Sequence, residues 1–266
     1  MPRYTPEQHQ QFIDEFNRDG FVVLKNHYDT QRIQQWAAAF KPLLAATLAD
    51  PAQTGARGTQ RFYVTLPFEG LWADPHFFDD DDVLAVVSGV AGASPVMCQL
   101  ATDTPLRGSE YQPVHRDTPA LFPELTDTEV PAYQLAVNFA LCPVTLDNGP
   151  LETTRGTHRM TRAQAERALA EGRVALEPIP MELGDVMIRD VRVMHRGTPN
   201  NSDEPRPMVV IGYSRRWYFR PEVSIHVPDA TWETLSERAR HLLRYNPRVK
   251  DLADAPATER YQAFAY

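Results

Sequence analysis

Cysteine is scarce in this sequence, with only Cys98 and Cys142 among 266 residues. The chain can therefore form one disulfide at most, and it lacks the cysteine framework of small secreted proteins. The two cysteines also lack the spacing of a structural zinc site. Both occur in stretches that we predict to be buried strands. We expect a reducing, cytoplasmic location.

Long apolar runs and a basic surplus are also missing. No apolar segment approaches the roughly 18 residues that a membrane-spanning helix needs, and residues 1–11 lack the apolar core of a signal peptide. The formal net charge is -8 at pH 7. Nucleic acids and anionic membranes attract basic surfaces, so we expect neither as the main partner. A small-molecule substrate is compatible with this charge, and the oligomeric state stays open.

The helical signals are concentrated in the first third of the chain. Thr5 and Pro6 are a good N-cap and first residue for a helix that ends at Gly20. Residues 30–48 have the apolar periodicity of a second helix. Four consecutive aspartates at 79–82 suit the N-terminus of a short helix, so we interpret them as a solvated helix start rather than a metal site. Two further helices are predicted at 162–171 and 230–244.

Short strands dominate the rest of the sequence. In residues 133–142, apolar residues alternate with Gln, Ala and Asn, which predicts one apolar and one mixed face. Many short strands without β-α-β alternation indicate a sandwich or a jelly-roll barrel. The predicted strands are residues 21–24, 61–66, 95–100, 133–142, 174–178, 185–191 and 208–217. We expect a single domain over 1–266, with an N-terminal layer of helices and strands at about 1–94, a barrel core at about 95–220 and a C-terminal helical segment at about 228–266.

The first chemical signal is the motif His115-Arg-Asp117. Residues i and i+2 of an extended segment point to the same side, so both side chains can reach one metal ion. Two histidines and one carboxylate on one face of an octahedron are typical of iron(II) oxygenases. The motif alone is weak, because about one His-x-acid triplet is expected by chance in this composition. A second copy, His27-Tyr-Asp29, is better explained by a helix cap at Asp29.

Two downstream residues strengthen the metal hypothesis. His195 follows a predicted strand and can supply the second histidine, and Arg206 opens the next strand. An arginine at the mouth of a barrel can bind a carboxylate through two parallel N–H groups. A 2-oxo acid cosubstrate that chelates the metal would need such an anchor. A buried His–carboxylate hydrogen bond explains His115 and Asp117 alone, but it leaves His195 and Arg206 without a role.

These motifs resemble the phytanoyl-CoA dioxygenase-like (PhyH) family of Fe(II)/2-oxoglutarate-dependent oxygenases. The resemblance covers most of the chain, in order. It rests on Gly20-Phe-Val-Val-Leu, Gln112-x-x-His115-x-Asp117, Asn148-Gly-Pro-Leu-Glu-x-x-x-Gly156-Thr-His158, Gly184-Asp-Val and His195-x-Gly197-x-x-Asn200-x-Ser202-x-x-x-Arg206. It implies a mainly β fold with α covering, in which a double-stranded β-helix (jelly-roll, cupin-like) core is flanked by helices.

The resemblance also implies the cofactors and their ligands. Iron(II) would be held by His115, Asp117 and His195, which are then the catalytic centre, and Arg206 would bind the distal carboxylate of 2-oxoglutarate. Gln112 is a further candidate for cosubstrate contact. The implied reaction consumes O2, oxidises a small organic molecule, most simply by hydroxylation, and releases succinate and CO2. Related iron halogenases have Gly or Ala in place of the carboxylate, so Asp117 favours oxidation over halogenation. Secondary metabolism is our expectation for the substrate.

Two departures from the family pattern affect the cosubstrate contacts. Some relatives have a hydroxyl residue two positions after the distal histidine, where this chain has Gly197. Thr198 is a weak substitute. Many relatives have Pro where this chain has Arg155. Gln99 and Asn138 lie on predicted strands and could contact the cosubstrate or substrate from the barrel interior, although hydrogen bonds to buried backbone explain them equally well.

Other histidines and other functions were weighed against these assignments. His158 reads as part of a structural turn, and His76 lies in a Pro/Asp-rich segment of uncertain role. Residues 61–63 could belong to a segment that covers the substrate. The alternative functions are a non-catalytic metal-binding β-barrel protein and a cupin-like hydrolase or isomerase. Arg206 argues against a pure metal binder, which needs no carboxylate anchor.

Overall fold

A computed structural model describes residues 2–50, 57–122, 124–125, 130–218 and 225–255. Within them the α-helices are α1 (Pro6–Asp19), α2 (Thr30–Ala49), α3 (Pro75–Phe78), α4 (Asp81–Ala91), α5 (Arg162–Ala170), α6 (Asp229–Thr234) and α7 (Glu237–Leu242). The strands are β1 (Phe21–Leu24), β2 (Arg61–Thr65), β3 (Val96–Pro105), β4 (Gln134–Ala140), β5 (Leu151–Thr153), β6 (Glu177–Ile179), β7 (Val186–Asp190), β8 (His195–Gly197), β9 (Met208–Ser214), β10 (Val227–Pro228) and β11 (Arg248–Val249). Short 3-10 helices cover Gly70–Ala73, Thr157–Arg159 and Leu252–Asp254.

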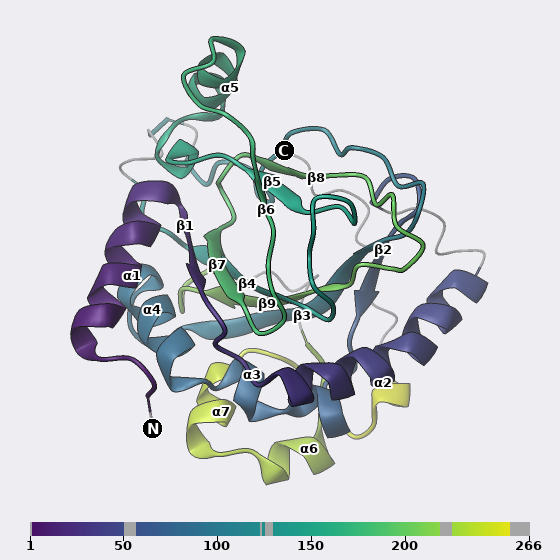
Figure 1. The fold of residues 1–266 in the computed structure, drawn as a ribbon. Coiled ribbons are helices and arrows are strands. Elements are labelled where there is room, and N and C mark those ends of the chain that lie inside the picture. Colours follow the sequence, from purple (N-terminus) through teal and green to yellow (C-terminus); the bar gives the residue numbers. More distant parts are fainter. Residues whose placement is uncertain (1, 51–56, 123, 126–129, 219–224, 256–266) are drawn as a thin grey trace.

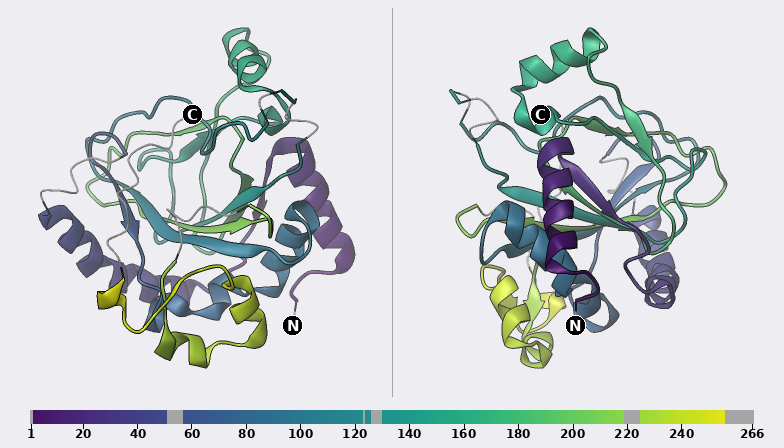
Figure 2. Two further views of the ribbon diagram at one scale, coloured as in Figure 1. Left: turned by 180° about the vertical axis from the view of Figure 1, so that it is seen from behind. Right: turned by 60° about the vertical axis from the view of Figure 1, so that its left-hand side comes forward.

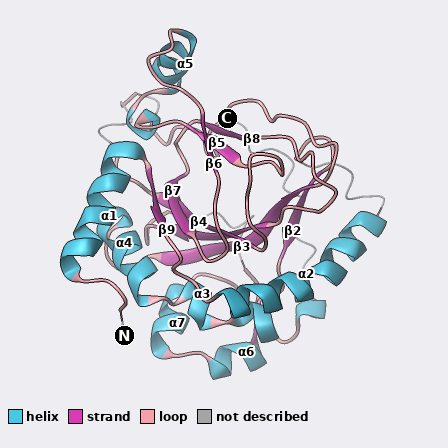
Figure 3. Ribbon diagram, viewed as in Figure 1, coloured by secondary structure: helices cyan, strands magenta, loops and turns pink. Residues whose placement is uncertain are grey.

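Two antiparallel sheets form the centre of the molecule (Figure 1). The large sheet has six strands in the order β1-β7-β4-β9-β3-β2, and the small sheet has three in the order β6-β5-β8. The small sheet faces one side of the large sheet, as Figure 3 shows with the strands in magenta. Strands that are distant in sequence are neighbours in both sheets, which is the connectivity of a jelly roll. This arrangement agrees with the predicted double-stranded β-helix core.

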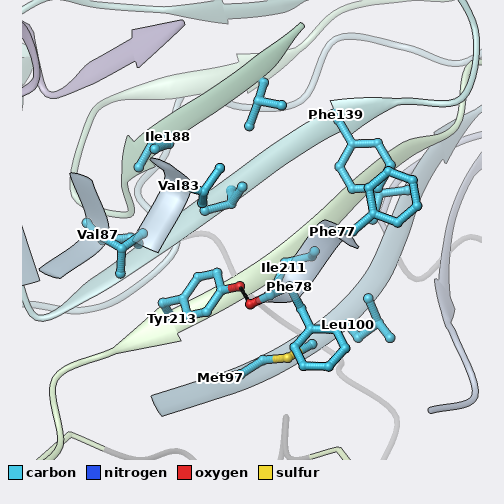
Figure 4. Packing of buried hydrophobic residues seen from close by; sticks show 14 of the residues in the cluster. Phe77, Phe78, Val83, Val87, Met97, Leu100, Phe139, Ile188, Ile211 and Tyr213 are labelled. Atoms are coloured by element: carbon cyan, nitrogen blue, oxygen red, sulfur yellow. Dashed lines mark hydrogen bonds between the residues drawn. The ribbon is translucent and has the colours of Figure 1, made fainter. Parts of the chain in front are cut away.

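Helices cover the other face of the large sheet (Figure 2). Alternate residues of β4, Leu135, Val137 and Phe139, join the main apolar cluster there, as the period-two pattern predicts. Figure 4 shows Phe77 and Phe139 stacked, with ring centroids 4.8 Å apart. Each fully buried aromatic side chain of this kind stabilises the fold by about 1.5–3 kcal/mol. The apolar core is therefore outside the β sandwich, which leaves the space between the sheets for the polar faces of their strands.

The predicted helix ends of the N-terminal layer are confirmed. Thr5 caps α1 in a capping box with Gln8, and Gly20 ends it in a left-handed conformation with φ of 86°. Asp29 caps α2 by accepting from the backbone N–H groups of Gln31 and Arg32. At α4, Asp80 is the N-cap and the next two aspartates lie in the first turn. The aspartate run is thus a helix start, as expected.

Three details differ from the sequence-based expectations. The segment 230–244 contains two short helices rather than one, because Leu235 is extended and Ser236 caps α7. The strand expected at 174–178 begins only at Glu177. β1 and β2, expected in the outer layer, are the edge strands of the large sheet. The prediction that residues 1–266 form one domain stays a prediction.

Both cysteines are free in this structure, so the single disulfide that the composition allowed is not formed. Among the described helices, none has the length and apolar character needed to cross a membrane.

Candidate metal centre

His115, Asp117 and His195 come together at one end of the space between the sheets. One ligand atom from each lies within 4.8 Å of the others. Oδ1 of Asp117 is 3.4 Å from Nε2 of His195 and 4.0 Å from Nε2 of His115. These spacings suit three ligands on one face of an octahedral metal ion. Of the residues the sequence pointed to, these three are therefore brought to a common point.

The backbone holds the two histidines side by side. The N–H of His115 donates to the carbonyl of His195 at 2.9 Å, and the N–H of His195 donates back at 3.0 Å. This reciprocal pair joins a loop residue to the first residue of β8. Sequence reasoning placed His195 after a strand. It begins one instead, because a turn with a hydrogen bond from Val193 N–H to the Asp190 carbonyl separates it from β7.

Main-chain carbonyls set the tautomer of both rings. Nδ1 of His115 lies 2.7 Å from the carbonyl oxygen of Pro113, and Nδ1 of His195 lies 2.9 Å from that of Val193. A ring nitrogen that donates to a carbonyl carries the proton, so Nε2 of each neutral ring keeps its lone pair. Both Nε2 atoms face Asp117. The rings are thus prepared to bind a metal through Nε2.

The electrostatics of the site keep the ligand atoms unprotonated. Burial, reinforced by the neighbouring His195, lowers the pKa of His115 to about 4. Burial acts in the opposite direction on Asp117, but Arg189 and His195 outweigh it and hold the pKa of this carboxyl well below its ordinary value. Metal ions compete with protons for these atoms. At neutral pH the site therefore presents two neutral imidazoles and one carboxylate.

Arg206 lies in the same cavity, which is also lined by Asp103, Gln112 and Gly197. Its side chain is 3 % exposed, and among the described residues its Nε has no hydrogen-bond partner. Burial lowers the pKa of Arg206 to about 10, so the guanidinium stays charged at neutral pH. A buried cation with an unpaired donor is costly unless an anion binds there. Arg206 therefore has the properties expected of a carboxylate anchor.

The remaining predicted contact residues all line this cavity. The side chain of Gln112 is already engaged: its Oε1 accepts from Gly197 N–H at 2.9 Å. Gln99 donates to the hydroxyl of Tyr63 at 2.6 Å. Asn138 donates to the carbonyl of Val209 at 3.2 Å, which agrees with the backbone alternative for this residue. Thr198 donates to the carbonyl of Pro150, which gives its hydroxyl a structural role.

Several other candidates lie away from the centre. His158 is buried in the turn after β5, with a hydrogen bond to the backbone of Asn17, as the structural interpretation predicted. His76 packs against Tyr28 and Phe77. His27, Asp80 and Asp82 form a second group with metal-like spacing in the described part of the chain. Asp80 there is committed to capping α4.

Sequence reasoning missed two charged residues of the cavity. Arg189 on β7 bonds Asp117 directly, with Nη2 2.6 Å from Oδ2. Asp103 on β3 accepts from Arg61 at 2.9 Å. A signal for Arg189 was available, because it is a charged residue inside a run predicted to be a buried strand. A charge at such a position is rarely tolerated without a partner.

Solved structures with the same fold are enzymes of natural-product and solute metabolism. SnoN, a non-haem α-ketoglutarate-dependent epimerase from nogalamycin biosynthesis, is 20% identical with a TM-score of 0.63, over 79% of this chain and 84% of that one. AviO1 from Streptomyces viridochromogenes Tue57 is 21% identical with a TM-score of 0.61, over 80% and 97%. SnoK, a carbocyclase from nogalamycin biosynthesis, is 18% identical with a TM-score of 0.59, over 80% and 85%. At these identities the likeness shows the fold.

A family comparison adds the class of enzyme. The model of the phytanoyl-CoA dioxygenase (PhyH) family matches residues 16–208, which include the three candidate ligands and Arg206. The match spans both sheets of the sandwich and the cavity between them. The donor set found there, two imidazole nitrogens and one carboxylate, suits non-haem iron. The chain therefore belongs to the phytanoyl-CoA dioxygenase family of iron- and 2-oxoglutarate-dependent oxygenases.

Proposed function

We propose that the protein oxidises a small organic molecule, most simply by hydroxylation, with His115, Asp117 and His195 as the ligands of iron(II). The observation that carries the proposal is the convergence of two Nε2 atoms and one carboxylate oxygen within 4.8 Å. Three ligands on one face leave the opposite face of the ion open for cosubstrate and dioxygen. When bound, the iron supplies the activation of dioxygen, and the protein supplies binding and orientation.

Arg206 is the proposed partner of the distal carboxylate of 2-oxoglutarate. A guanidinium presents two parallel N–H groups that match a carboxylate, and the buried setting strengthens the pairing. Gln112 lies between this end of the cavity and the metal centre, where its Oε1 fixes the backbone of Gly197. We propose that Gln112 orients the strand that carries His195. Gln99 and Asn138 are proposed to shape the cavity wall, because their amides already bond protein atoms.

The cavity wall supports a compact organic substrate. Apolar side chains alternate with the polar ones, which is typical of small-molecule sites. The apolar members of the lining are Ala136, Leu151, Met187, Val191, Met208 and Val210. SnoN has been solved with Fe3+, α-ketoglutarate and nogalamycin RO. By analogy of fold, we propose a substrate from secondary metabolism for this chain.

Hydroxylation is the proposed outcome. In that reaction the substrate C–H becomes C–OH, while 2-oxoglutarate and O2 become succinate and CO2, and all atoms balance. The names of SnoN and SnoK describe an epimerase and a carbocyclase, and these outcomes are the specific alternatives. Product mass separates the three, because hydroxylation adds one oxygen atom, ring closure removes two hydrogen atoms and epimerisation leaves the mass unchanged.

The direct test of the proposal is anaerobic titration of the iron(II)-loaded protein with 2-oxoglutarate. A weak visible charge-transfer band should appear on chelation, and succinate should form after oxygen is admitted. Candidate substrates that stimulate succinate formation then define the substrate class. A protein that binds iron but shows neither band nor succinate would have a different function.

A further inference from the structure

Arg189 projects into the metal cavity from the middle of β7. Met187, Arg189 and Val191 line the cavity, whereas Val186 and Ile188 face the apolar core on the other side of the sheet. This is the period-two alternation of a strand. The side chain of Arg189 is buried, with 7 % exposure. The fold therefore places a permanent cation at an interior position whose neighbours on the same face are apolar.

The guanidinium of Arg189 contacts two of the three proposed ligands. Its Nη2 lies 2.6 Å from Oδ2 of Asp117. Its Nη1 lies 3.3 Å from Nδ1 of His195, on the side of the ring that faces away from Asp117. The other oxygen of Asp117, Oδ1, is the one that faces Nε2 of both histidines. Arg189 thus divides the two carboxylate oxygens between itself and the metal position.

The consequence concerns the number of oxygen atoms that Asp117 can offer a metal. A carboxylate can bind with one oxygen or chelate with both, and chelation would occupy one of the positions opposite the triad. While Oδ2 accepts a charge-assisted hydrogen bond from Arg189, only Oδ1 is free to bind. 2-Oxoglutarate needs two adjacent open positions, and dioxygen needs a third.

We propose that Arg189 is a positioning residue that holds Asp117 as a ligand through one oxygen and so keeps the cosubstrate positions open. The inference rests on the proposed function, because it assumes that Asp117 binds the metal. Nothing in it requires Arg189 to touch the cosubstrate. Its role is to fix a ligand in the way that outer hydrogen bonds fix metal ligands generally.

The test uses Co(II) as a spectroscopic probe in place of iron. Arg189→Met should shift the visible spectrum of the Co(II) protein before any cosubstrate is added, because the freed carboxylate can bind through both oxygens. The affinity of the Co(II) protein for 2-oxoglutarate should fall by roughly tenfold or more, since the cosubstrate must displace the second oxygen. The affinity for Co(II) itself should stay close to that of the wild type.

Arg192→Met is the matched control. Arg192 is another buried arginine, paired with Asp190 at 2.8 Å, and its printed contacts do not include the triad. It should lower the melting temperature without changing the Co(II) spectrum. Arg189→Lys retains one charged donor and should keep a spectrum close to that of the wild type. If Arg189→Met does not fold, Arg189→Gln carries the test, because its neutral side chain is too short to reproduce the ion pair.

The possible results separate the inference from its neighbours. An unchanged Co(II) spectrum with weaker 2-oxoglutarate binding would overturn it in favour of direct contact between Arg189 and the cosubstrate. Equal losses in the Arg189 and Arg192 variants would reduce Arg189 to a structural role. If the wild-type Co(II) protein binds no 2-oxoglutarate, the proposed function fails. If the wild type binds it and Arg189→Met behaves identically, only the present inference fails.

Discussion

The guanidinium of Arg61 occupies the space beside Gly197 that a side chain at position 197 would need. A Cβ on Gly197 would lie 2.6 Å from Cζ of Arg61 and 2.6–2.7 Å from its two terminal nitrogens. Arg61 is 1 % exposed and is held there by Asp103 and by the carbonyl of Thr198. The glycine that departs from the family pattern is thus explained by an arginine from β2, at the far edge of the large sheet.

Gly197→Ala is the first prediction. Because Arg61 is held on two sides, the new methyl group should destabilise the protein by about 1–3 kcal/mol through overpacking. In an Arg61→Ala background the extra cost should largely vanish. A double-mutant cycle by urea denaturation measures the coupling. Costs that simply add would show that the two residues do not compete for space.

The two His-x-Asp motifs should respond differently to loss of the aspartate. Asp117→Ala should abolish binding of Co(II) or iron(II), because one of three proposed ligands is gone. Asp29→Ala should leave metal binding unchanged and lower the free energy of unfolding by about 1 kcal/mol, through loss of the α2 cap. Equilibrium dialysis against metal and denaturant unfolding provide the two readouts. Retained metal binding in Asp117→Ala would remove Asp117 from the ligand set.

Arg206 should control cosubstrate affinity. Arg206→Met should raise the concentration of 2-oxoglutarate needed for half-saturation by about tenfold to a hundredfold, as expected for a lost charge-assisted pair. Arg196→Met is the control. Arg196 lies beside His195 on β8, but its side chain pairs with Glu152 at 2.7 Å. Comparable losses in both variants would point to a general effect on β8 instead of a carboxylate anchor.

The metal-free protein should lose stability as the pH falls from 6.5 towards 4. The unfolded chain protonates His115 near its ordinary pKa of 6.5, while the folded protein resists protonation until about pH 4. The unfolded state therefore binds more protons in this window, and stability decreases as pH decreases. The contribution is full above pH 6.5 and amounts to roughly 3 kcal/mol over the window.

Urea denaturation in the presence of a chelator, repeated across this pH range, measures the slope. His115→Gln should flatten it, because glutamine does not titrate. An equally steep slope in His115→Gln would assign the pH dependence to other groups.

Local patterns were sufficient to predict much of this protein. The caps at Thr5 and Asp29, the aspartate run before α4 and the alternation along β4 depend on neighbours within a few residues, and all agree with the structure. The ligand order His115, Asp117, His195 could be recognised because its chemistry demands particular residue types. The split of the predicted C-terminal helix into two was missed, because Leu235 and Ser236 carry no strong breaker signal.

Tertiary structure alone decided how the charged residues of the cavity are paired. The pairs Arg189–Asp117 and Arg61–Asp103 join residues 72 and 42 positions apart. The approach of Arg61 to Gly197 joins the outer strands of two different sheets. Such contacts depend on strand order and register, which a sequence pattern does not contain. The sequence by itself determined which residues can bind a metal, and the fold decided which cation holds each carboxylate.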